Sequence, residues 1–100
     1  MAKSILCGND YPVCFITGNT LNLDRHHVLN GALRDWAEQE GLWIYLNHTT
    51  HMWIHQTGAG KQVMMKLKRY AQMKWEEVHA DEYEDVRAEW MKKVRKNYVL

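Results

Sequence analysis

The chain has 100 residues, of which 46% are hydrophobic and 11% aromatic, with only one proline. This composition excludes a disordered chain, and so short a sequence has apolar surface for one modest core, which predicts a single domain over residues 1–100. The net charge of +1 excludes a polycation. The apolar runs are too short to cross a bilayer and no signal peptide is visible, so we expect a cytoplasmic protein without a membrane partner.

The first part of the chain predicts an irregular arm followed by a hairpin. Residues 1–12 form the arm, which closes in a turn around Pro12. An extended segment over 13–17, a turn at Gly18-Asn19 and a return strand follow. The adjacent pair His26-His27 is therefore expected at the end of this ribbon.

The middle of the chain predicts a short helix and a second strand. The helix runs from about residue 31 to residue 40 and ends at Gly41, which suits the left-handed conformation of a helix end. The segment 42–46 is apolar with aromatic and β-branched side chains, and it predicts a strand. A turn that begins at Thr49 or Thr50 should carry the next two histidines.

Two helices are expected after this turn. Residues 57–60 contain two glycines and break the pattern before a long helix over 61–79, where apolar residues recur at three- and four-residue steps. A C-terminal helix over about 81–97 has Asp81 as its predicted cap, with Glu84 three positions on. The aromatic and methionine stripes of both helices are expected in the core.

Five of the six histidines fall within thirty residues, and four of them form two close pairs. On a helix, imidazoles four residues apart face the same way, so His51 and His55 can bind one ion. In an extended segment, His26 and His27 point to opposite sides, so one can hold a metal while the other faces a substrate water. The pattern predicts a metal-assisted hydrolase.

The remaining reactive side chains are expected to have ordinary roles. Cys7 and Cys14 are too few for a disulfide framework, and a reducing cytosol keeps them as thiols. The most economical interpretation of Cys7 is a small buried residue. His48 and His79 are expected to be surface or partly buried residues.

Between Lys61 and Lys74 five cations occur without an acid, a charge density suited to phosphate contacts. A solvated helix face, paired with the acidic run that begins at Glu76, is the alternative. The expected DNA contacts are Arg25, Arg34, Lys61, Lys66, Lys68 and Arg69.

Six segments stand in an order and spacing that resemble one known family. They are Cys14-Phe15-Ile16-Thr17-Gly18, His26-His27-Val28, Gly41-Leu42-Trp43-Ile44-Tyr45-Leu46-Asn47, His51, Ile54-His55 and Leu67-Lys68-Arg69-Tyr70-Ala71-Gln72. Over about residues 14–98 the chain resembles the HNH, or ββα-metal, nucleases, and especially their small phage-encoded members.

The resemblance implies an α+β fold, with a ββα-metal, treble-clef-like core over about 13–79 and additional C-terminal helices. It implies that His26, His51 and His55 bind one divalent ion, while His27 is the general base for the attacking water. Three imidazoles suit Zn²⁺ or Ni²⁺ better than the oxygen-preferring Mg²⁺, and families of this kind are often permissive, Mn²⁺ included. The implied activity is endonucleolytic hydrolysis of DNA in the cytoplasm of a bacterial host.

Two departures from the family's pattern stand out. Where relatives carry four zinc-binding cysteines, this chain has Cys14, Thr17, Asn47 and Thr50, so we expect no structural zinc and support from packing instead. The middle asparagine of the HNH motif is missing, because its place falls near Leu42.

The competing hypothesis is a non-catalytic, HNH-derived binding protein that holds DNA or a protein partner, for instance a phage inhibitor of a host nuclease. The lost cysteines favour this hypothesis. Retention of all four histidines argues against it, because a scaffold freed from metal chemistry has no chemical need for them.

Overall fold

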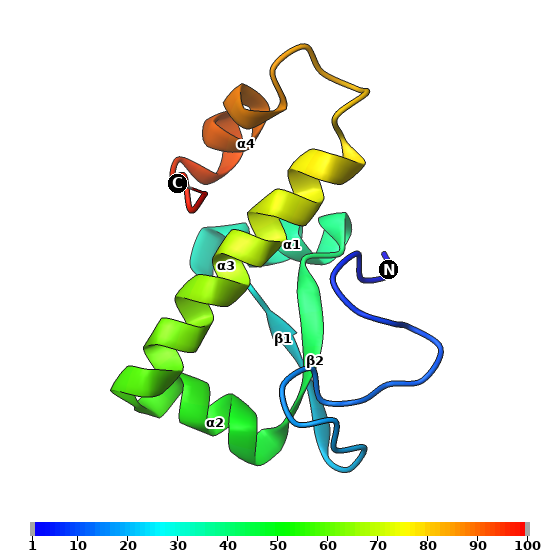
Figure 1. Ribbon diagram of the computed structural model, residues 1–100, viewed down its shortest axis with the longest axis vertical. Helices are drawn as coiled ribbons and strands as arrows, with labels where there is room; N and C mark the ends of the chain where they lie inside the picture. Colours follow the sequence, from blue (N-terminus) through cyan, green and yellow to red (C-terminus); the bar gives the residue numbers. More distant parts are fainter. Residues whose placement is uncertain (1, 100) are drawn as a thin grey trace.

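Two strands and a series of helices make up the part of the chain that the computed structural model describes, residues 2–99 (Figure 1). In chain order the elements are β1 (Leu23–His27), the short 3₁₀ helix η1 (Gly31–Leu33), α1 (Arg34–Glu40), β2 (Trp43–Asn47), α2 (His48–Gln56), α3 (Gly58–Val78) and α4 (Val86–Val94). The expected α+β class is confirmed. No helix within residues 2–99 combines the length and the apolar character that crossing a membrane requires.

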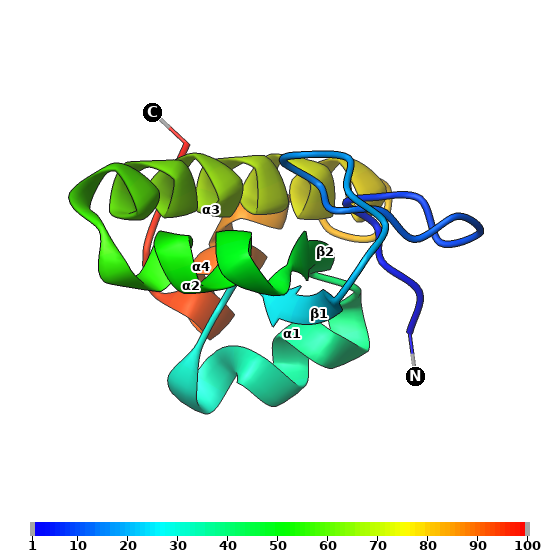
Figure 2. The same ribbon diagram turned by 90° about the horizontal axis from the view of Figure 1, so that it is seen from below.

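The sheet is the antiparallel pair of β1 and β2. Successive side chains of a strand point to opposite faces, so Asp24 and His26 share one face of β1, whereas Arg25 and His27 share the other. Figure 2 shows α3 on one side of this strand pair and α1 on the other. The two neighbouring histidines are therefore directed toward different layers of the fold.

The expected helix over 31–40 is present as η1 followed by α1, and Gly41 ends it with a φ of 72°. The N-terminal arm runs against this position, where the N–H of Ile5 donates to the Gly41 carbonyl at 2.9 Å. A Cβ atom on Gly41 would collide with the carbonyl oxygen of Lys3. Glycine is required here both by the left-handed conformation and by the close approach of the arm.

The expected strand over 13–17 is wrong, because this segment forms a tight turn. The N–H of Gly18 donates to the carbonyl of Cys14 at 2.8 Å, and the N–H of Phe15 donates to the carbonyl of Tyr45 in β2, also at 2.8 Å. Gly18 adopts a φ of 76°, and the Cys14 side chain is 1% exposed. Closing the turn buries the thiol, which an extended segment would leave on the surface.

α2 begins with Asn47 as its cap, slightly before the turn expected at Thr49 or Thr50. The side-chain oxygen of Asn47 accepts the N–H of Thr49 at 3.0 Å and satisfies one of the free donors of the first turn. His51 and His55 therefore stand one turn apart on a helix, as their spacing predicted.

α3 approaches α2 backbone to backbone at Gly60. The expected break is present at Thr57, whose backbone is extended between α2 and α3, but α3 begins at Gly58 rather than at Lys61. The Thr57 hydroxyl caps α3 by accepting the N–H of Gly60 at 2.8 Å, so both glycines lie in the first turn. A Cβ atom on Gly60 would lie 2.6 Å from the Cα of Ile54 and would also meet the carbonyl oxygen of Trp53. The missing side chain of Gly60 thus sets how closely the two helices pack.

α4 starts later than expected. Its cap is Asp85 rather than Asp81, and the Asp85 carboxylate accepts a backbone N–H of the first turn at 3.0 Å. Trp90 of α4 is fully buried and meets the rings of Trp36 and Trp75 at centroid distances of 6.0 and 5.7 Å. Trp90 and Val94 of the expected stripe therefore lie in the core, and Trp90 joins α1 and α3 across it. Tyr83 and the α3 methionines Met65 and Met73 are exposed, so the expectation that all of these stripes are buried is wrong.

We predict that Gly60→Ala lowers the free energy of unfolding by about 1–3 kcal/mol, the usual cost of overpacking. Gly58→Ala is the matched control in the same helical turn, because a Cβ there meets nothing within 4 Å. That control should leave the free energy unchanged or raise it by up to about 1 kcal/mol. Urea denaturation of the three proteins measures the effect, and equal stability of both variants would contradict the close approach.

Candidate metal centre

Three imidazoles converge where the end of β1 meets α2. His26, His51 and His55 each offer a ring nitrogen, and these nitrogens lie within 4.8 Å of one another. Nδ1 of His26 is 3.3 Å from Nε2 of His51, and the ring centroids are 5.0 to 5.6 Å apart. Neutral imidazoles gathered in this way form a set of ligands for one transition-metal ion. The three metal ligands predicted from the sequence therefore come together, and the spacing is compatible with one ion.

His26 is the buried member of this cluster. Only 2% of the residue is exposed, and its Nε2 is buried without a hydrogen-bond partner among the described residues. Burial, reinforced by the neighbouring rings of His51 and His55, lowers the pKa of His26 to about 3. The ring is thus neutral at physiological pH, the state in which an imidazole can bind a metal ion.

Asp24 supports the cluster from the same face of β1. Its Oδ2 accepts hydrogen bonds from Nδ1 of His51 at 3.0 Å and from Nδ1 of His48 at 2.8 Å. The bond from His51, followed by that from His48, lowers the pKa of Asp24. A carboxylate on Nδ1 orients the His51 ring and leaves Nε2 free to face His26, the usual arrangement behind a metal-binding histidine.

His27 lies on the opposite face of β1 and has different partners. Its Nε2 is 3.7 Å from Oε2 of Glu38, and Nε of Arg34 donates to its Nδ1 at 3.5 Å. Burial lowers the pKa of His27, although the Glu38 carboxylate acts in the opposite direction. His27 is therefore a neutral imidazole beside α1, outside the cluster of three.

The two predicted arginine contacts flank His27. Arg25 forms an ion pair with Glu38 at 2.6 Å, and its guanidinium lies 3.9 Å from the centre of the Trp43 ring. Because Glu38 offsets the charge of Arg25, the attraction of this arginine to phosphate is reduced. Arg34, in contact with His27, is the more exposed of the two.

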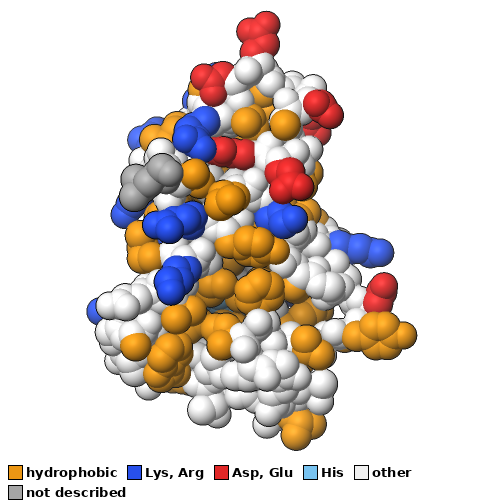
Figure 3. Space-filling model, in the orientation of Figure 1, with side chains coloured by type: hydrophobic (Ala, Val, Ile, Leu, Met, Phe, Trp, Pro, Cys, Tyr) orange, Lys and Arg blue, Asp and Glu red, His pale blue; other side chains and the backbone are white. Residues whose placement is uncertain are grey.

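The remaining predicted DNA contacts lie on α3 and are separate from the acidic run. Among the lysines of residues 2–99, the ion pairs are Lys74–Glu77 and Lys92–Glu89. Figure 3 shows acidic side chains gathered at the end of the molecule where α3 passes to α4. The sequence-based alternative of internal pairing therefore holds for Lys74, but not for Lys61, Lys66 or Lys68.

Hydrogen bonds surround Cys14, the one cysteine among the four positions at which the sequence resemblance led us to look for zinc ligands. Sγ of Cys14 accepts the N–H of Thr17 at 3.5 Å, while Asn47 serves as the cap of α2. Burial raises the pKa of Cys14, but bonds from the Thr17 hydroxyl and from the backbone of Asn47, Thr17 and Ile16 outweigh it and lower the pKa to about 7. The thiol of Cys14 and the side chain of Asn47 thus both have hydrogen-bond partners within the protein.

The sequence interpretation missed two carboxylates, Asp24 and Glu38. The signal for Asp24 was present, because two residues before His26 in a strand is a position on the same face. No local signal identified Glu38, since its contact with His27 depends on how α1 packs on the sheet. Its Oε2 is also buried without a hydrogen-bond partner among the described residues.

Comparisons of the chain with protein-family models, with curated proteins and with solved structures find no match. The class that the fold and the site define is an α+β protein with a three-histidine cluster able to hold a metal ion.

We predict that the metal-free protein loses stability as the pH falls from about 6.5 to about 3. The pKa of His26 is about 3 in the folded chain against an ordinary 6.5, so only the unfolded chain binds this proton in that window. The free energy of unfolding should fall by at most about 1.4 kcal/mol per pH unit from this residue. His26→Phe should flatten the pH dependence measured by urea denaturation. Identical slopes for the two proteins would contradict the burial of a neutral ring.

We predict that Asp24→Ala weakens metal binding about 10- to 100-fold, because His51 loses the carboxylate that orients its ring. Asp10→Ala, in the exposed part of the N-terminal arm, is the control and should bind as the native chain does. Competition with a chromophoric chelator for Zn²⁺ measures both affinities. An unchanged Zn²⁺ affinity of the Asp24→Ala variant would show that Asp24 does not support metal binding.

Proposed function

We propose that the protein is a metal-dependent DNA endonuclease of the ββα-metal type. The observation that supports this most is the meeting of His26, His51 and His55 beside a pocket lined by Lys61 and Lys68. Ligands for a cation and side chains attractive to an anion are therefore adjacent, as phosphodiester hydrolysis requires.

The order of the elements supports the ββα-metal assignment. One ligand comes from the end of β1, and the other two come from α2, which follows β2 directly. Strand, strand and helix in this order match the core implied by the sequence resemblance. α1 is the insertion between the strands, and α3 and α4 are the additional C-terminal helices.

In this proposal His26, His51 and His55 hold one divalent ion, and nitrogen ligands favour Zn²⁺ or Ni²⁺ over Mg²⁺. When bound, the ion neutralises charge on the phosphoryl group and on the departing 3′ oxygen. Asp24 keeps the His51 ring aligned. The scissile phosphate then lies at the end of β1, between the histidine cluster and His27.

His27 is the proposed general base. A water oxygen forms a bond to phosphorus, the bond from phosphorus to the 3′ oxygen breaks, and the water's proton passes to Nδ1 of His27. Its lowered pKa keeps the ring unprotonated at neutral pH, and the Glu38 carboxylate lies 3.7 Å from Nε2. Arg34, at 3.5 Å from Nδ1, would turn from the base to a phosphate oxygen when DNA binds.

The second candidate is a non-catalytic binding protein built on the same core. The contact between Arg34 and Nδ1 of His27 favours it, because a general base needs a free nitrogen. The neutralisation of Arg25 by Glu38 favours it too, since it removes one cation from the DNA contacts. A phage inhibitor that binds a host nuclease would belong to this class.

We predict that His27→Ala lowers cleavage of supercoiled plasmid at least about 100-fold while metal affinity persists, whereas His51→Ala lowers both. His79→Gln is the control, because His79 packs on Trp75, away from the cluster. Nicking is measured with Zn²⁺, Ni²⁺, Mn²⁺ and Mg²⁺, alongside metal content. If the native chain binds metal but cleaves plasmid with none of these ions, the non-catalytic binding protein is the function that remains.

A further inference from the structure

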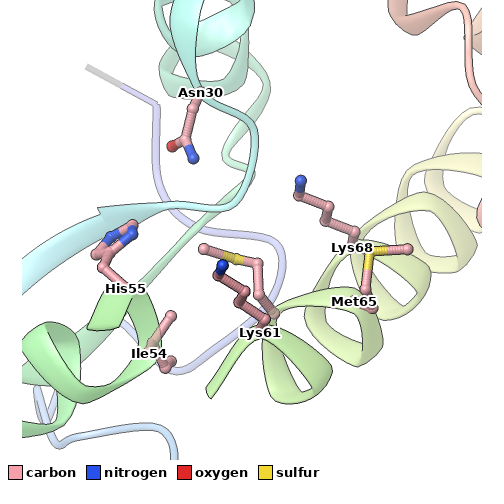
Figure 4. A pocket seen from close by; sticks show the side chains of 7 residues that line it. Asn30, Ile54, His55, Lys61, Met65 and Lys68 are labelled. Atoms are coloured by element: carbon pink, nitrogen blue, oxygen red, sulfur yellow. The ribbon is translucent and has the colours of Figure 1, made fainter. Parts of the chain in front are cut away.

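A pocket of about 330 Å³ opens beside His55, between α2, α3 and the segment after β1. Its size is at the lower end of the range of about 300–1,000 Å³ found for small-molecule sites. Figure 4 shows the amide of Asn30 and the amines of Lys61 and Lys68 directed toward a common space beside His55. This size and these groups suit one ligand of about nucleotide dimensions.

The charged side of the pocket selects an anion. Lys61 and Lys68 line it, no carboxylate does, and neither lysine has an ion pair among the described residues. His55 lines the same pocket, so the two amines lie beside the histidine cluster. A phosphate bound between the two lysines would therefore lie next to the scissile phosphate at the ion.

The other side of the pocket is apolar. Ile54 is 1% exposed and Met64 is 9% exposed, so both form a fixed wall, whereas Met65 is 46% exposed at the edge. A phosphate alone gains nothing from such a wall. A nucleobase does, because each base has a flat apolar face and a methionine sulfur is polarisable and adapts its shape.

Asn30 adds a group that can meet the edge of a base. It occupies the N-cap position of η1, where an asparagine usually accepts a backbone N–H, yet its side chain makes no capping bond. The amide instead lines the pocket and offers both donors and an acceptor. Hydrogen bonding to a base edge is a use that fits this orientation.

We infer that the pocket binds one unpaired nucleotide of a DNA strand, with its phosphate between Lys61 and Lys68 and its base against Met64 and Met65. This inference rests on the proposed function for the choice of DNA. A base inside a duplex is stacked on both faces and paired along its edge, so it cannot enter the pocket without leaving the helix. The substrate class is therefore DNA with a single-stranded segment or end next to the cleaved bond.

Binding to two hairpin probes tests the inference independently of cleavage. Both probes have the same duplex and a short single-stranded tail, with thymine bases in one tail and abasic residues in the other. Fluorescence anisotropy with a chelator present prevents hydrolysis, and circular dichroism checks the fold. The native chain should bind the thymine tail about five- to tenfold more tightly, the range expected for contact with one base.

Substitutions locate the preference in the pocket. Met65→Ala should remove most of it, whereas Met73→Ala, a matched exposed methionine of α3 outside the pocket, should retain it. Lys61→Gln should weaken binding of both probes to the same extent, because the proposed contact of Lys61 is with phosphate and not with the base.

Equal affinity of the native chain for both tails, or an equal loss in the two methionine variants, overturns the inference. If the native chain prefers the thymine tail but cleaves DNA with none of the four ions, the nucleotide pocket is supported and the nuclease activity is overturned. Cleavage together with equal affinity for the two tails supports the nuclease and overturns the nucleotide pocket. The two proposals can therefore fail independently.

Discussion

The side-chain alternation of β1 is the constraint on which the rest of the arrangement depends. Five residues have only two faces, so Asp24 and His26 meet α2 while Arg25 and His27 meet α1. A shift of one residue in the pairing of β1 with β2 would exchange these sets and separate the three imidazoles. The two faces also separate the charges: Asp24 lies behind the three-histidine cluster, and Glu38 lies beside His27.

The helix that carries His51 and His55 is held by packing from both sides. Ile54 enters the core between these two histidines, and the absent side chain of Gly60 lets α3 close on α2. Behind α3, the rings of Trp36, Trp75 and Trp90 bind α1 and α4 into the same core. Apolar contacts thus do for this short chain what a structural metal does for many small domains.

Local patterns predicted those features of the fold that depend on neighbouring residues in the sequence. The helix end at Gly41, the second strand and the helical spacing of His51 and His55 are of this kind. Two errors have one physical origin, because tertiary contacts chose between locally equivalent conformations: Cys14 is buried within a turn over 13–17, and Gly60 is part of α3 where that helix contacts α2. The third error is local, because Asp85 was one of several acids able to cap α4. Glu38 could not be identified from the sequence, because its contact with His27 depends on how α1 packs on the sheet.

The turn around Cys14 is held together by hydrogen bonds and by its contact with β2. A domain supported by zinc thiolates folds only as fast as zinc is delivered, and it comes apart when an oxidant attacks the sulfurs. Here the same corner closes through Thr17 and the backbone of Asn47, with a single buried sulfur at its centre. Each of these contacts comes from the chain itself, so closing the turn depends on packing and hydrogen bonding around Cys14.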